Sequence, residues 1–165
     1  LYSALRLSRG GYPKDGFFLR AESFYNVASE IERLDNIPAA SPPIIDGYGG
    51  VSLHEQSHGE SFMALAMNRF RGHGLYILDE PEAALSPTAQ MALLARLYEL
   101  ARNDSQLIIA THSVIISALP DADVYEITEK GINKTEYVKT SHYNIMKHFV
   151  NSPEKMVSDL TGKER

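Results

Sequence analysis

The stretch LYILDEP, residues 75–81, decides the fold of this 165-residue chain. Four apolar residues run without interruption and end in two acidic residues and a proline. A continuous apolar run that ends in this way is typical of a parallel strand buried on both faces. Because α/β sheets carry their chemistry at the carboxyl ends of the strands, Asp79 and Glu80 are the first candidates for a functional site.

A second apolar run, LIIA at residues 107–110, follows a segment of helical periodicity. Ser86 is suited to cap that helix and Pro87 to occupy its first turn. A strand, a helix and a second strand predict a right-handed parallel crossover, which brings the ends of the two strands close together. The second strand ends in THS, residues 111–113, so His112 is expected near Asp79 and Glu80.

The remaining pattern predicts a single α/β domain over residues 1–165. The sequence indicates a buried strand at 17–19, a helix at 21–34, a breaker-rich loop at 36–50 and a helix at 60–70. Apolar segments at 124–128 and 132–138 flank Lys130 and Gly131 and predict a hairpin, and a helical tail begins at His142 and breaks at Pro153. We expect the core at 17–128, with a hairpin strand and the helical tail at 129–165.

The acids and the histidine have a functional and a structural interpretation. An apolar strand that ends in Asp-Glu is the Walker B arrangement, in which Asp79 positions Mg²⁺ through its water shell and Glu80 polarises the attacking water. His112 is able to donate to a terminal phosphate oxygen or hold that water. Alternatively, Asp-Glu-Pro merely ends a strand, and a lone histidine is a capping or core residue.

Several motifs together resemble one family. Residues 75–87 and 110–113 resemble the Walker B, D-loop and switch-histidine segments of ABC-type ATPases. More narrowly, they resemble soluble, non-transporter AAA-type ATPases of bacteria, in the branch of chromosome-maintenance and recombination-repair ATPases. Residues 57–61, SHGES, resemble the signature loop of that family, and residues 17–22, FFLRAE, resemble the region where its Q-loop begins. The resemblance extends to about Thr128.

The resemblance implies a P-loop NTPase fold of the ABC-ATPase type, with a mostly parallel sheet flanked by helices. It implies hydrolysis of ATP with Mg²⁺, by a sandwich homodimer that closes through the signature loop. Glu80 and His112 then act in catalysis and Asp79 holds the metal. The implied nucleotide-binding residues are Ser57, His58, Gly59, Glu60 and Ser86, and Glu22 matches the Q-loop glutamine by position.

The signature loop also makes physical sense as an anion site. A hydroxyl at Ser57 and the backbone amides around Gly59 stand where a helix begins, and the N-terminus of a helix attracts negative charge. The resemblance implies that this anion is the γ-phosphate held by the opposite subunit.

The chain departs from the family pattern at several points. No Gly-x-x-x-x-Gly-Lys-Ser/Thr phosphate loop occurs in it, and it begins with Leu1. We therefore expect a domain incomplete at its N-terminus, with an exposed sheet edge, and no activity from the chain alone. His58 stands where glycine is commoner, Gln56 where leucine is commoner, and Ser86 where transporters carry aspartate.

Two other classes of function remain as alternatives. HEQSH, residues 54–58, is a literal zinc-hydrolase pattern with His54 and His58 as ligands and Glu55 as base. It lies between glycines at a helix entrance, which loosens the geometry, and it leaves Asp79 and His112 without a role. The second alternative is a non-catalytic module, derived from a truncated ATPase, that dimerises or binds a partner.

Composition sets further bounds. The formal net charge of −5 gives no basic footprint for nucleic acid, although nucleic acid or an effector protein stays open as a partner. The chain contains no cysteine, which suits a reducing cytoplasm. No apolar run approaches the ~20 residues of a membrane-spanning helix, so we expect no membrane association and a cytoplasmic location.

Overall fold

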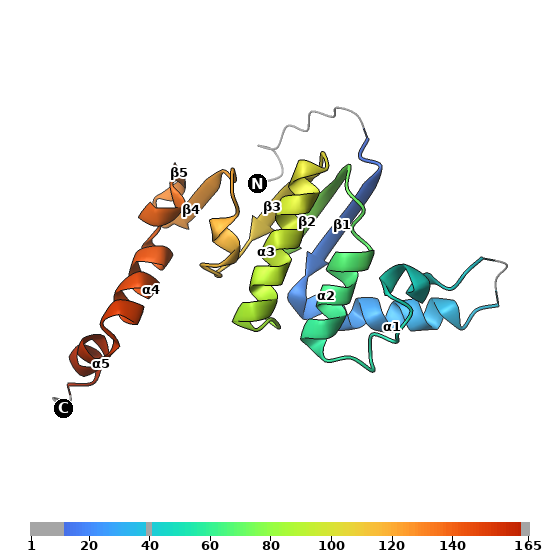
Figure 1. The fold of residues 1–165 in the computed structure, drawn as a ribbon, viewed down its shortest axis with the longest axis horizontal. Coiled ribbons are helices and arrows are strands. Elements are labelled where there is room, and N and C mark those ends of the chain that lie inside the picture. The colour runs from blue at the N-terminus through green and yellow to red at the C-terminus, as the bar shows by residue number, and fades with distance from the viewer. Residues whose placement is uncertain (1–11, 39–40, 163–165) are drawn as a thin grey trace.

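The computed structural model describes residues 12–38 and 41–162. It confirms the α/β class, with a parallel sheet flanked by helices (Figure 1). The strands are β1 (Asp15–Arg20), β2 (Gly74–Asp79), β3 (Gln106–Ala110), β4 (Val124–Thr128) and β5 (Gly131–Thr135). The helices are α1 (Phe24–Asp35), α2 (His58–Asn68), α3 (Pro87–Arg102), α4 (Ser141–Asn151) and α5 (Pro153–Thr161).

The central sheet has the order β1-β2-β3, and both pairings are parallel. The predicted connection of β2 through α3 to a parallel neighbour is therefore confirmed in order and direction. Asp79 lies opposite Arg20 on one side and Ala110 on the other. Because all three strands run in the same direction, their carboxyl ends meet at one edge of the sheet.

One face of this sheet holds the core. The inward side chains of the strands pack against the buried faces of α2 and α3, which lie side by side over the sheet (Figure 1). The fully buried members are Leu19, Tyr76 and Leu78 from the strands, Phe62 and Leu65 from α2, and Leu93, Leu97 and Leu100 from α3.

The opposite face differs from the prediction. We expected all three strands to be buried, and β2 on both faces, but Phe18 of β1 is 65% exposed and Ile108 of β3 is 51% exposed. Ile77, between them in the register, is half-buried. The reason is that α2 and α3 pack on the side of Tyr76 and Leu78, so the alternate side chains of the strands lack a covering helix among the described residues.

Capping residues set where the helices begin. Ser86 accepts a hydrogen bond from the amide of Ala89 and Pro87 occupies the first turn of α3, as the sequence predicts. The second helix begins at His58, two residues earlier than Glu60, because Ser57 is its cap. Residues 21–23 form a 3-10 turn, so α1 begins at Phe24 instead of Ala21.

A polar cluster closes the amino edge of the sheet. The ring of Tyr76 is fully buried, and its hydroxyl donates to the Asp15 carboxylate at 2.7 Å. The same hydroxyl accepts from the amides of Arg71 and Gly72. Arg69 donates to the other carboxylate oxygen of Asp15 at 2.7 Å. These bonds tie β1, β2 and the end of α2 together where the strands begin.

The C-terminal part forms a second, smaller unit of structure. Among the residues that the structure describes, strands β4 and β5 pair with each other alone, and they are antiparallel. The sequence predicted that the second strand of this hairpin extends to Val138. Strand β5 ends at Thr135, because residues 137–139 form a 3-10 turn. The break at Pro153 is confirmed, since that proline begins α5. Helices α4 and α5 extend away from the sheet (Figure 1), and no helix in the described ranges is long and apolar enough to cross a membrane.

Replacing Asp15 with asparagine tests the polar cluster through its pH dependence. Burial raises the pKa of Asp15, but hydrogen bonds from Arg69, Tyr76 and the Arg71 amide outweigh burial, so the pKa lies below its ordinary value. A lowered pKa means that the carboxylate stabilises the fold above its unfolded pKa of about 3.9, and that this stability is lost as the pH falls through the folded value.

We expect D15N to lower the free energy of unfolding at pH 7 by about 2 kcal/mol. On acidification below pH about 4, the unfolding free energy of D15N should fall by less than that of wild type. Urea unfolding at several pH values measures both effects. The control is E30Q, which removes an exposed pair with Arg33. Equal acid slopes for D15N and wild type would contradict the argument.

Candidate functional site

The carboxyl edge of the sheet gathers charged and polar side chains from the ends of β1 and β2 and from the segment that follows β3. Arg20 ends β1, and its Nε donates to Oδ2 of Asp79, the last residue of β2, at 2.8 Å. The hydrogen bond and the attraction of Asp79 raise the pKa of Arg20, with smaller contributions from Glu22 and Glu80. Glu22 lies in the 3-10 turn that follows β1, two residues after Arg20.

Glu80 and His112 face each other across the ends of β2 and β3. The Glu80 amide donates to the carbonyl of Ala110 at 2.9 Å, which continues the strand pairing by one residue. Oε1 of Glu80 lies 3.6 Å from Nε2 of His112, and the two side chains are 51% and 79% exposed. The structure thus brings Glu80 and His112 together, whereas the Asp79 carboxylate is turned toward Arg20.

The backbone of Glu80 is strained. Its φ is +50°, in the left-handed region that residues other than glycine rarely adopt. The conformation turns the chain sharply out of β2, directly after Asp79. Left-handed backbone costs on the order of 1–2 kcal/mol for a residue with a Cβ, and such strain is concentrated at functional sites.

Glu82 is a residue of this edge that the sequence pattern does not single out. Its carboxylate accepts hydrogen bonds from the hydroxyl of Thr111 and from the amide of His112, each at 2.6 Å. The only signal in the sequence is a further acidic residue two positions after Glu80, which by itself indicates no partner. Its partners Thr111 and His112 are 29 and 30 residues away in the sequence, and the pairing of β2 with β3 brings them next to Glu82.

The predicted signature loop forms the N-terminus of α2. Ser57 and Glu60 make a capping box, in which the Glu60 amide donates to the Ser57 hydroxyl at 3.3 Å and the Ser57 amide donates to the Glu60 carboxylate at 2.9 Å. The Ser57 hydroxyl also donates to that carboxylate at 2.6 Å. These bonds lower the pKa of Glu60. The negative charge that favours this helix end is therefore supplied by the chain itself. His58 lies with its ring edge-on to Phe24 of α1.

Gly59 brings the signature loop against the predicted D-loop. A Cβ built on Gly59 would lie 2.7 Å from the carbonyl oxygen of Ala84, closer than real Cβ atoms come. The absence of a side chain thus lets the start of α2 approach the backbone of Ala84 directly. Ser86, which we predicted to bind nucleotide, has an observed role as the cap of α3.

The zinc pattern does not form the helix that such a site needs. His54 lies in a turn before α2, and its ring is near Ser29 and Glu32 of α1. His58 is the first residue of α2 and contacts Phe24. The two histidines are therefore not one turn apart on a helix. Within residues 12–38 and 41–162, no group of three metal-ligating side chains is close enough to hold an ion.

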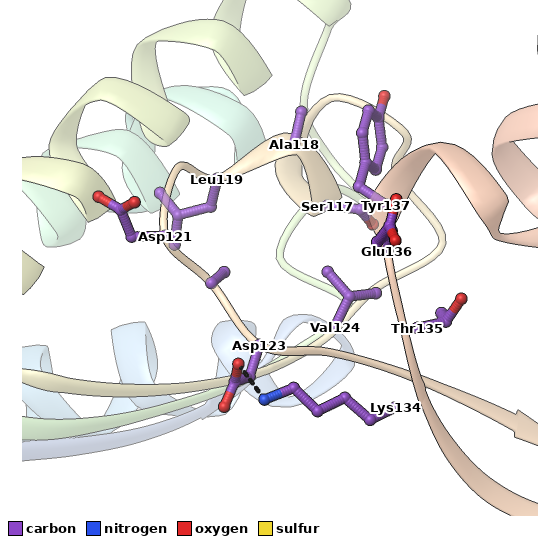
Figure 2. Close-up of a pocket in the computed structure, with 11 residues that line it drawn as sticks. Ser117, Ala118, Leu119, Asp121, Asp123, Val124, Lys134, Thr135, Glu136 and Tyr137 are labelled. Carbon is purple, nitrogen blue, oxygen red and sulfur yellow. Dashed lines mark ion pairs between the residues drawn. The ribbon is translucent and has the colours of Figure 1, made fainter.

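A cavity of about 390 Å³ lies where the core meets the hairpin. Figure 2 shows the segment from Ser117 to Val124 on one side and residues 134–137 on the other, with Asp123 and Lys134 joined in an ion pair of 2.6 Å. None of the residues at the carboxyl edge of the sheet lines this cavity. It is a feature of the joint between the two parts of the chain.

The fold and this edge define an α/β domain of the P-loop NTPase type, and comparison with known proteins agrees. The family model described as "AAA domain, putative AbiEii toxin, Type IV TA system" matches residues 15–118, and the chain belongs to this AAA family. The match begins at β1 and ends at the 3-10 turn that follows His112.

A curated relative is the chromosome partition protein Smc of Mycolicibacterium paratuberculosis. It is 44% identical over 69 residues, which are 42% of this chain and 6% of Smc. The chain thus spans a small part of that protein. No solved structure gives a significant match.

Replacing Glu80 with glycine tests the backbone strain. Glycine adopts a positive φ without the Cβ clash, so we expect E80G to raise the free energy of unfolding by about 1 kcal/mol relative to E80A. E80A is the matched control, because it removes the carboxylate and keeps the Cβ. Urea unfolding of both variants measures the difference, and an E80G variant no more stable than E80A would contradict the strain argument.

Replacing Gly59 with alanine tests the contact between α2 and the D-loop. Helix propensity alone predicts a gain in stability, whereas the approach to Ala84 predicts a loss of about 1–3 kcal/mol. The sign of the change in unfolding free energy therefore decides between them. G47A is the control, since a Cβ at Gly47 meets no atom within 4 Å. A stabilised G59A would show that the contact is not tight.

Proposed function

We propose that this chain is the Walker B half of an ATP-hydrolysing domain of the ABC type, working as a sandwich dimer. In this proposal Glu80 is the general base that activates the attacking water, His112 contacts the terminal phosphate, and Asp79 holds Mg²⁺. A cytoplasmic location accords with the absence of cysteine from the chain.

The observation that carries the proposal is the meeting of Glu80 and His112. The two side chains come from adjacent parallel strands, lie 3.6 Å apart and are open to solvent. A carboxylate next to an exposed imidazole is able to orient a water molecule and to donate to a phosphate oxygen. The strained φ of Glu80 supports the same role, since a turn at this point aims the carboxylate outward from the strand end.

The residues at this edge fit Mg²⁺. Mg²⁺ prefers oxygen ligands and retains water, so one carboxylate at a strand end, with phosphate oxygens, suffices to hold it. When bound, the ion would neutralise charge that develops on the phosphates. In the structure Arg20 supplies the positive charge beside Asp79. We propose that Arg20 balances the carboxylates of this edge until nucleotide is present.

The signature loop supports the dimer part of the proposal. Ser57 and the first amides of α2 stand at a helix N-terminus that already attracts the Glu60 carboxylate. We propose that the γ-phosphate bound by a second copy competes with Glu60 for the Ser57 hydroxyl. The contact of Gly59 with Ala84 puts the signature loop and the D-loop on one continuous surface, as an interface through both loops requires.

A non-catalytic module is the second candidate, because no phosphate-binding loop occurs within the 165 residues. The two functions differ in what the coding sequence encodes upstream. An in-frame phosphate loop there supports the ATPase, and its absence supports the module.

The decisive variant is E80Q, in a polypeptide that joins this chain to its upstream phosphate loop. Glutamine has nearly the shape of glutamate but is not a base, so we expect turnover to fall by about 10²- to 10⁴-fold. ATP binding should persist. The fraction of dimer should rise, because closed dimers would no longer hydrolyse ATP and dissociate. Phosphate release, ATP titration and light scattering measure these quantities.

The matched control is E99Q, which makes the same change on the exposed side of α3, in a pair with Arg96. It should retain wild-type turnover. The chain of 165 residues alone should bind ATP weakly and not hydrolyse it. Turnover by E80Q at the wild-type rate would show that Glu80 is not the base.

A further inference from the structure

The segments that follow β2 and β3 are joined by one side chain. The Glu82 carboxylate accepts from the Thr111 hydroxyl through Oε2 and from the His112 amide through Oε1, both at 2.6 Å. Both bonds are short, as expected when the acceptor is charged. Glu82 thus holds two successive residues of the neighbouring strand end, one through its side chain and one through its backbone.

The rest of the segment after β3 is fixed from the same side. The Thr111 hydroxyl accepts from the Ser113 amide, and the Ser113 hydroxyl donates to Oε1 of Gln90 on α3. Nε2 of Gln90 in turn donates to the carbonyl of Leu85. The loop after β2 and the start of α3 therefore determine the backbone path through His112.

The His112 side chain has little else to fix it. It is 79% exposed, so burial contributes little to its orientation. Within the described part of the chain, its ring lies near the Glu80 carboxylate at 3.6 Å and the ring of His142, whose centroid is 6.3 Å away. Exposed contacts of this kind are weak. The direction in which the ring projects therefore depends mainly on the backbone of His112, which Glu82 holds.

We propose that Glu82 is a positioning residue, which acts through the His112 amide to keep the imidazole beside Glu80. This proposal rests on the proposed ATPase function. Glu82 does not contact substrate in it; its carboxylate couples the turn that carries Glu80 to the segment that carries His112. A movement of either strand end is then transmitted to the other.

The structural part of the proposal is tested on the 165-residue chain by amide NMR. In E82A the His112 amide loses its charged acceptor, so its proton resonance should move upfield and its hydrogen exchange should accelerate by about tenfold or more. E82Q keeps one acceptor oxygen and should lie between wild type and E82A. The control E99A should leave the His112 amide unchanged. An unaltered His112 amide in E82A would overturn the proposal.

The kinetic part uses the polypeptide with its phosphate loop. Misplacing a catalytic group by about 1 Å costs up to about 100-fold in rate. We therefore expect E82A to lower kcat by about 10- to 100-fold and to leave KM for ATP unchanged. T111V should show part of the loss, and T111S, which keeps the hydroxyl, should rescue it.

A purely structural role for Glu82 would lower stability and leave kcat of the folded protein at the wild-type value, which would overturn the proposal. If E82A fails to fold, E82Q supplies the same comparison. Failure of the proposed function has a different signature: E80Q would then be fully active, while the NMR effect of E82A on His112 would persist.

Discussion

Parallel hydrogen bonding of β2 to both of its neighbours brings residues from distant parts of the sequence to one line. The register sets Asp79 between Arg20 and Ala110, so the loops that leave the three strands all start from the same edge. The pairing is stabilised from one side by the burial of Tyr76 and Leu78 under α2 and α3. The contacts of Asp79 with Arg20, of Glu80 with His112 and of Glu82 with His112 follow from this alignment, because the partners are separated by tens of residues in the chain.

The carboxylates at this edge are stabilised in different ways. Asp79 is paired with a guanidinium, Glu82 is held by a hydroxyl and an amide, and Glu80 remains exposed beside an imidazole. A carboxylate that is already well bonded is suited to hold structure, and an exposed one is free to meet a ligand. The distribution of partners thus distinguishes Glu80, which is exposed beside His112, from Asp79 and Glu82, whose carboxylates are already bonded within the chain.

The C-terminal part touches the same segment. The hydroxyl of Tyr137 donates to the carbonyl of Val114 at 2.7 Å, and His142 at the start of α4 lies near His112. The hairpin and α4 are therefore anchored within two residues of His112, although α5 extends far from the sheet (Figure 1). A change in the position of the segment after β3 would therefore move the residues that begin α4.

The sequence by itself determined the α/β class, the parallel crossover from β2 to β3, the cap at Ser86 and the break at Pro153. These features depend on local periodicity, on capping chemistry and on the fixed backbone of proline, all of which are readable within a few residues. The pattern also indicated that Asp79, Glu80 and His112 belong to one edge, because the ends of parallel strands coincide.

Only the tertiary structure decided which of these groups touch. Three contacts join residues more than twenty positions apart. They are the ion pair of Asp79 with Arg20, the hydrogen bond from the His112 amide to Glu82, and the approach of Gly59 to the Ala84 backbone. Such contacts depend on register and on side-chain direction, which apolar periodicity does not encode. The exposure of one sheet face was missed for the same reason, since an apolar run is compatible with one covered face or two.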